Sequence, residues 1–270
     1  MCLVVLAYRP DERHELVVAA NRDEWFKRAT APAGFWKDHP DVFAGRDLEQ
    51  GGTWLGVSRR GRFAALTNFR DPPAHRPGAP SRGALVAEFL TADGAALACL
   101  SDLRGRADRY NGFGLLAWDG SSLAFLSSRN GGVTVLEPGL YGLSNHLLDT
   151  PWPKVREGKR RLAETIAHPF GALDLLTLLD STEAAPDAEL PDTGVGRDWE
   201  RKLSPMRIVA GDYGTRSSTA LVVTRAGDVE VAERTFDREG APTETVFERF
   251  RIERPARARA PSRRAGFPLP

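Results

Sequence analysis

Cysteine is scarce in this chain, which has only Cys2 and Cys99 among 270 residues. Two cysteines exclude a disulfide framework and a cysteine-rich zinc site, and we expect a reduced, cytoplasmic setting. A charge excess is also missing, since 37 basic side chains face 36 acidic ones. General nucleic-acid binding, which depends on a strong basic excess, is therefore not expected.

Long apolar runs are absent as well. No stretch approaches the roughly 18 apolar residues of a membrane helix, so we expect no integral membrane association. The first run, "CLVVLAY", has no basic segment before it and soon meets Arg9, Pro10 and Asp11. This pattern does not predict a signal peptide.

What is present is an alternation of strand and helix patterns. Two continuous apolar runs, at 2–8 and 15–20, predict a hairpin whose strands are buried on both faces. The remaining expectations are a second hairpin at 53–58 and 62–68, helices at 82–92 (with Ser81 as N-cap) and 95–104, strands within 112–143, helices at 154–168 and 171–180, and strands at 218–224, 228–236 and 244–250. This order favours an α+β fold, in which two antiparallel sheets pack together and helix pairs cover their outer faces. We expect one domain over 1–253 and a basic, proline-rich disordered tail over 254–270.

Cys2 is the first candidate for chemistry. Removal of Met1 would leave a cysteine that carries a free α-amino group, whose reference pKa is about 8. Such an amine can take the thiol proton and later return it to a leaving group, so the nucleophile carries its own base. The alternative is structural, because cysteine is among the most frequently buried residue types. Cys99 lies in the apolar helical pattern "AALACL" and is expected to pack in the core.

The second candidate is the polar run "NRDE", Asn21 to Glu24. Placed at the end of a strand, it is typical of a solvated turn. A hairpin with its turn near residues 11 and 12, however, puts residue 2 opposite residues 20–22. Arg22 would then lower the thiol pKa, and Asp23 would orient the terminal ammonium.

Several other polar or aromatic residues stand where a pocket can use them. Asn68 and Asn145 follow strands and are possible oxyanion donors, although most such asparagines cap turns. Arg216 precedes a strand, and Trp54 in "GGTWLG" fits either a pocket wall or the core. The histidines show no metal-ligand spacing, and no nucleotide-binding motif is present.

Taken together, "MC", "NRDE", "GGTWLG", "TNFR", "SRG", "GLSN" and "YGTRSST" resemble the NRDE family, also called the transport and Golgi organisation protein 2 family. The resemblance implies a four-layer αββα sandwich like that of N-terminal-nucleophile hydrolases, with similarity to cysteine amidases that act on penicillin V and conjugated bile salts. It further implies that Cys2 is nucleophile and base, that Arg22 and Asp23 are nearby charges, that Asn68 and Asn145 are oxyanion donors, and that Arg216 is the late arginine.

Two functions follow from this resemblance. The first is an amidohydrolase that cleaves a linear C–N amide bond through a Cys2 thioester and needs no cofactor, with Asn21, Glu24 and Trp54 at the substrate. The second is a non-catalytic carrier of haem or an acyl-CoA-like amphiphile, with Cys2 or His146 as the haem ligand. Loops at 27–52 and 70–80, which hold Trp25, Phe26, Phe35 and Trp36, are expected to form an apolar pocket.

Overall fold

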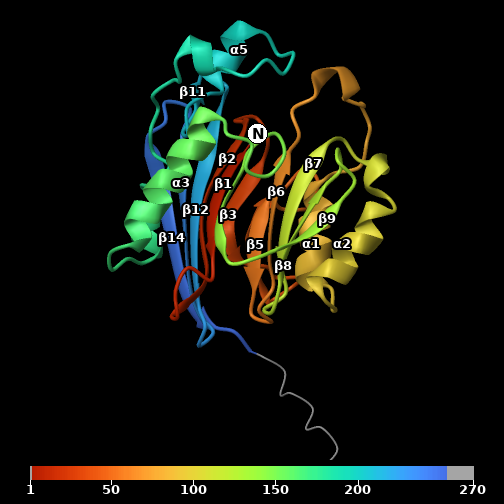
Figure 1. Ribbon diagram of the computed structural model, residues 1–270, viewed down its shortest axis with the longest axis vertical. Helices are drawn as coiled ribbons and strands as arrows, with labels where there is room; N and C mark the ends of the chain where they lie inside the picture. The colour runs from red at the N-terminus through yellow and green to blue at the C-terminus, as the bar shows by residue number, and fades with distance from the viewer. Residues whose placement is uncertain (1, 254–270) are drawn as a thin grey trace, which may run out of the picture.

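The computed structural model describes residues 2–253 of the chain (Figure 1). It opens with the expected hairpin, formed by β1 (Cys2–Tyr8) and β2 (His14–Trp25). The register pairs Cys2 with Arg22 and Val4 with Ala20, which confirms the predicted position of residue 2 opposite residues 20–22. The predicted tail, 254–270, lies outside the described residues.

The first sheet is built around this hairpin. β1 and β2 lie at its centre, with strands from the end of the chain on one side and one strand from the middle of the chain on the other. In spatial order the sheet consists of β10 (Gly139–Leu143), β1, β2, β12 (Tyr213–Thr224), β13 (Asp228–Phe236) and β14 (Pro242–Arg251), with β11 (Val209–Ala210) paired to β12. All of its pairs are antiparallel.

The second sheet is a meander in which each strand pairs with the next one along the chain. Its strands are β3 (Thr30–Phe35), β4 (Val42–Asp47), β5 (Leu55–Ser58), β6 (Phe63–Asn68), β7 (Phe113–Trp118), β8 (Leu123–Ser127) and β9 (Val133–Leu136). Every pair is again antiparallel, so each strand needs only a short connection or a helical insertion to reach its neighbour.

Three apolar layers separate four layers of secondary structure. The middle one lies between the sheets, where Val4 and Leu6 of β1 meet Phe63 and Trp118 of the second sheet. Helices cover both outer faces, as Figure 1 shows: α1 (Gly83–Thr91) and α2 (Ala96–Arg104) over the second sheet, and α3 (Pro153–Ile166) and α4 (Ala172–Leu175) over the first. The predicted α+β fold with an αββα order is confirmed.

Several local expectations were wrong. β2 continues through Trp25, so "NRDE" lies inside a strand and not beyond its end. Ser81 is not the N-cap of α1, because the helix begins after Arg82 and has no side-chain cap. The second predicted helix of the 154–180 region shrinks to α4, and the short helix α5 (Arg197–Lys202) was not predicted. Within residues 2–253, none of the helices is long and apolar enough to cross a membrane.

Candidate active site

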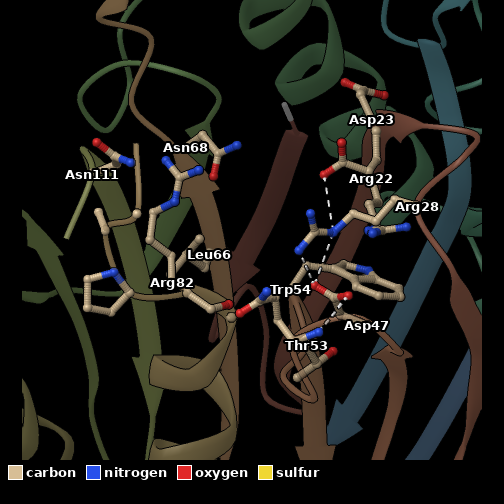
Figure 2. A pocket seen from close by; sticks show the side chains of 17 residues that line it. Arg22, Asp23, Arg28, Asp47, Thr53, Trp54, Leu66, Asn68, Arg82 and Asn111 are labelled. Carbon is tan, nitrogen blue, oxygen red and sulfur yellow. Dashed lines mark hydrogen bonds and ion pairs between the residues drawn. The ribbon is translucent and has the colours of Figure 1, made fainter. Parts of the chain in front are cut away.

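A polar pocket of about 380 Å³ opens between the ends of the two sheets (Figure 2). One wall comes from β2, β4 and the 50–54 segment, and the other from the end of β6, the start of α1 and Asn111. The described residues that line it are Arg22, Asp23, Glu24, Arg28, Asp47, Gln50, Thr53, Trp54, Leu66, Asn68, Gly78, Ala79, Pro80, Ser81, Arg82, Gly83 and Asn111.

Arg22 connects the pocket with the start of the chain. Its backbone pairs with that of Cys2, which places the first strand residue beside the pocket wall. The guanidinium stacks on the ring of Trp54, 4.2 Å from its centroid, and donates a hydrogen bond of 3.0 Å to the hydroxyl of Thr30. The Arg22 side chain is 5% exposed, so it is held as a fixed cation at this wall.

Asn21 does not line the pocket, although Arg22, Asp23 and Glu24 do. Its amide nitrogen donates to the main-chain oxygens of Leu179 and Met206, at 3.1 and 2.8 Å, and its oxygen accepts from Ser218 at 2.6 Å. The structure therefore places this predicted substrate contact in a buried network that ties β2 to β12 and to the α4 region.

Asp23 is buried at the rim of the same pocket. One carboxylate oxygen accepts a 2.6 Å hydrogen bond from Thr215. Burial raises the pKa of Asp23, and the positive charge of Lys154 acts in the opposite direction. Lys154, whose ammonium donates to the main-chain oxygen of Leu203 at 2.9 Å, was missed in the sequence. The rarity of lysine was the signal in the sequence that could have found Lys154, since the chain holds only five lysines.

The acidic residues of the first wall gather around one arginine. Arg28 pairs with Asp47 at 2.7 Å, with Glu49 at 3.5 Å and, more loosely, with Glu24 at 4.0 Å. Glu24, predicted to contact substrate, does line the pocket. Three carboxylates therefore surround Arg28, while Arg22 adds a second positive charge to the same wall.

The two predicted oxyanion donors have different positions. Asn68 is half-buried at the end of β6 and lines the pocket. Asn145 is fully buried, and its side-chain nitrogen donates to the main-chain oxygen of Asn68 at 2.9 Å. Arg70 adds to this link, because its main-chain nitrogen donates to the main-chain oxygen of Asn145 at 2.8 Å. Only Asn68 therefore lines the pocket, and Asn145 supports its position.

Arg216 lies in a β-bulge, and it lines a second cavity of about 210 Å³ on the other side of Arg22 and Trp54. Bulges redirect a side chain relative to the regular ladder. Its guanidinium donates to the main-chain oxygens of Trp25 and Arg28, both at 3.0 Å, and thereby fixes the turn after β2. Burial lowers the pKa of Arg216, and the neighbouring charge of Arg22 adds to this effect.

Within residues 2–253, the aromatic side chains of Trp25, Phe35 and Trp36 do not gather into the expected apolar pocket. Trp25 packs against Trp199 and Tyr213, outside the pocket lining, and Phe35 packs against Phe43 and Phe250. Trp36 is buried beside α1 and α2. Trp54 does form part of the pocket wall, where most of the other lining residues are polar.

Two glycines, Gly45 and Gly52, pack tightly against residues that line the pocket. A Cβ atom at Gly52 would lie 2.4 Å from the main-chain carbon of Gly83, and one at Gly45 would lie 2.4 Å from the Trp54 ring. The loop before β5 can therefore touch the start of α1 only because residue 52 has no side chain. This contact explains one glycine of the "GGTWLG" motif.

A haem carrier needs a single axial ligand from the protein, and His146 is the candidate whose side chain lies in the described part of the chain. Groups of three or more histidine, cysteine or acidic residues suited to a metal ion are not found there. His146 lies between the rings of Phe69 and Trp152, and its Nδ1 is 2.8 Å from the hydroxyl of Thr150. The carrier function stays a prediction with no contact that favours it.

Glu233 is a second buried carboxylate, in the cavity that also contains Arg216, and it leads to a pH prediction. It accepts hydrogen bonds from the nitrogen of Ala33 at 2.7 Å and from Thr219 at 3.1 Å. Burial raises the pKa of Glu233, against the opposing charge of Arg22. A raised pKa in the folded state means that stability present at low pH is lost as the pH rises through that value.

We therefore expect the stability of Glu233→Gln relative to the wild type to increase as the pH rises from 5 to 8, because the wild type must ionise a buried carboxyl group that the amide does not have. Urea unfolding at both pH values measures this difference. Glu244→Gln, on the exposed part of β14, is the matched control and should show no such trend. A constant difference for Glu233→Gln would mean that Arg22 neutralises the carboxylate fully.

The solved structures that are similar to this chain include two hydrolases of low sequence identity. A Caenorhabditis elegans N-acylethanolamine-hydrolyzing acid amidase ortholog aligns with 8% identity and a TM-score of 0.47 over 82% of this chain and 92% of its own. The C2A mutant of the conjugated bile acid hydrolase from Clostridium perfringens aligns with 10% identity and a TM-score of 0.43 over 93% and 92%. Both scores are below 0.5, so neither structure adds to the argument for a function.

Comparison by sequence gives a clear result. The Transport and Golgi organization protein 2 homolog of Bos taurus is 37% identical, and that of Homo sapiens is 36% identical. Each alignment covers 94% of this chain and all of the relative. The family model described as Transport and Golgi organisation 2 matches residues 1–238. The chain therefore belongs to the Transport and Golgi organisation 2 family.

Proposed function

We propose that this protein is an N-terminal cysteine amidohydrolase that cleaves a linear C–N amide bond. The observation that carries the proposal is the pairing of Cys2 with Arg22, because Arg22 lines a pocket that also holds Asn68 and Asp23. A cysteine at the start of a strand, a fixed guanidinium, a side-chain amide and a buried carboxylate are the groups that acyl transfer by an N-terminal nucleophile uses. The names of the relatives mention no reaction, so the proposal depends on the site.

The reaction begins after Met1 is removed. The α-amino group of Cys2 takes the thiol proton, and the thiolate sulfur forms a bond to the amide carbonyl carbon. The electron pair of the C=O bond moves to oxygen, and this oxyanion accepts a hydrogen bond from the Asn68 amide. Asp23 and Arg22 provide the opposite charges next to the ammonium and the sulfur.

The intermediate then collapses. The C–N bond breaks, and the ammonium returns its proton to the leaving amine, which departs and leaves a thioester on Cys2. Water attacks the thioester with the same amine as base, which releases a carboxylic acid and restores the thiol. Amide and water are consumed, and acid and amine are formed, so no oxidant, reductant or metal is required.

Peptide mapping of the wild-type protein tests this function. A small β-lactam such as penicillin V serves as the acylating probe, because ring strain favours acylation and the amine released by ring opening stays attached to the acyl group. We expect intact mass spectrometry to show loss of Met1 and one added probe, and mapping to place the adduct on Cys2. A protein that keeps Met1, or an adduct on Cys99 alone, would contradict the proposal.

A further inference from the structure

Charge is distributed unevenly around the pocket. On the side of β2 and β4, Glu24, Asp47 and Glu49 gather around Arg28. Figure 2 shows Arg82 on the opposite side, with Asn68 and Leu66, across the open space from Arg22 and Trp54. Among the described residues that line this second side, 66–83 and 111, Arg82 supplies the charge, and the others are apolar, amide, hydroxyl or glycine groups.

Arg82 is held in place by its surroundings. Its Nη1 atom donates a 2.9 Å hydrogen bond to the main-chain oxygen of Gly112. The next residue, Gly83, begins α1 and packs against Gly52 so closely that no side chain fits between them. A guanidinium at such a fixed position loses little side-chain freedom when it binds a ligand.

The segment before Arg82 is also anchored. The side chain of Asn111 pairs with both main-chain groups of Arg76, at 2.8 and 3.0 Å. Arg76 in turn donates to the main-chain oxygen of Tyr110 at 2.7 Å. Residues 76–83 are therefore tied to residues 110–112 through Arg76 at one end and Arg82 near the other. The first turn of α1 carries no acidic side chain, so the helix adds no negative charge to this wall.

These observations favour an anion on the side of Arg82, because on the other side Arg28 is already paired with Asp47, Glu49 and Glu24 and Arg22 is stacked on Trp54. A carboxylate next to Asp47 and Glu24 would be repelled, whereas near Arg82 it meets a planar cation whose fork matches its two oxygens. We infer that the pocket selects amides that carry a carboxylate, and that Arg82 is the residue that binds it. This inference names the class of substrate, and it rests on the proposed function in that the substrate is taken to be an amide.

Binding to the Cys2→Ala protein separates recognition from chemistry. The first ligand pair is N-phenylacetylglycine and N-phenylacetylglycinamide, which differ only in a carboxylate and a carboxamide on the amine side. The second pair is succinic acid monobenzylamide and N-benzylsuccinamide, which carry the same difference on the acyl side. Isothermal titration calorimetry gives a ratio of dissociation constants for each pair.

We expect the carboxylate to bind at least about 10-fold more tightly than its carboxamide in one pair, and that pair identifies the side of the amide on which the carboxylate lies. Adding Arg82→Gln should reduce the ratio to near one, and Arg82→Lys should restore part of it, since the charge returns without the fork. Arg249→Gln, an exposed arginine on β14, is the matched control and should leave the ratio unchanged.

Equal binding of carboxylate and carboxamide in both pairs would overturn the inference, and so would a ratio that persists in Arg82→Gln. Failure of the proposed function would give a different experimental result. In that case the wild-type protein would not be acylated on Cys2, while the preference for the carboxylate and its dependence on Arg82 would remain.

Discussion

Replacement of Cys2 by alanine will reduce turnover of every amide that the wild-type protein cleaves by at least about 10³-fold, because the nucleophile is removed while the amine and the pocket remain. The residual rate reflects binding and the Asn68 amide alone. Alanine at position 2 still permits removal of Met1, so the variant differs from the wild type by one sulfur atom. The measurement is steady-state release of the amine product.

Two further proteins make this result specific. Cys99→Ser is the matched control, since Cys99 is a half-buried residue of α2 whose sulfur lies 3.7 Å from Arg62, on the far side of the second sheet. It should keep wild-type turnover. Insertion of one alanine between Met1 and Cys2 keeps the thiol but separates it from the α-amino group, and turnover should fall nearly as far as in Cys2→Ala. Full activity in this insertion variant would show that the terminal amine is not the base.

The geometry behind this prediction could be obtained from the sequence because it is local. A hairpin turn of known length fixes which residues face each other, and the pairing of Cys2 with Arg22 follows from it. What the hairpin does not fix is where its strands end. β2 continues through "NRDE" because β12 pairs with it as far as Trp25, almost two hundred residues later in the chain. Local hydrophobicity carries no sign of that partner.

Two strands were missed for a related reason. The segments "TAPAGF" and "VFAGRD" contain proline and glycine, which have low strand propensity. They become β3 and β4 because the second sheet offers β5 as a partner and because Ala33 is bound by Glu233 of the first sheet. In the site, Asn68 and Arg22 were found from position alone, while Asn21 and Asn145 have partners that only the folded chain brings near.

Glu200 lies in the part of the site that is least predictable from the sequence. Its replacement has the largest expected effect on stability. It lies on α5 and pairs with Arg70 at 2.6 Å, and the two side chains are 2% and 4% exposed. Its other oxygen accepts hydrogen bonds from the nitrogen and the hydroxyl of Thr193, at 2.8 and 2.6 Å. The Arg70 guanidinium also donates to the side-chain oxygen of Asn145 at 3.4 Å, so this pair connects α5 to the amide that positions Asn68.

Glu200→Ala should therefore lower the free energy of unfolding by about 3–5 kcal/mol, because the buried guanidinium of Arg70 loses its counter-ion. For a chain of this size the Tm should fall on the order of 10 °C. Urea unfolding and thermal scans measure both quantities. Asp187→Ala, which removes the exposed partner of Arg201 in the same region, is the matched control and should cost at most about 1 kcal/mol.

The double variant Arg70→Met/Glu200→Leu distinguishes a lost counter-ion from a lost helix. If the cost in Glu200→Ala comes from the unpaired charge of Arg70, then removal of both charges should restore much of the stability, since a buried ion pair can be replaced by apolar side chains with little loss. The double variant should still be acylated more slowly than the wild type, because the Arg70 side chain that binds Asn145 is gone. Asn145 then no longer holds Asn68 at the pocket. Recovery of stability without recovery of rate would show that the buried pair serves the position of the Asn68 amide more than the stability of the fold. Recovery of neither would mean that α5 itself requires Glu200 in order to dock.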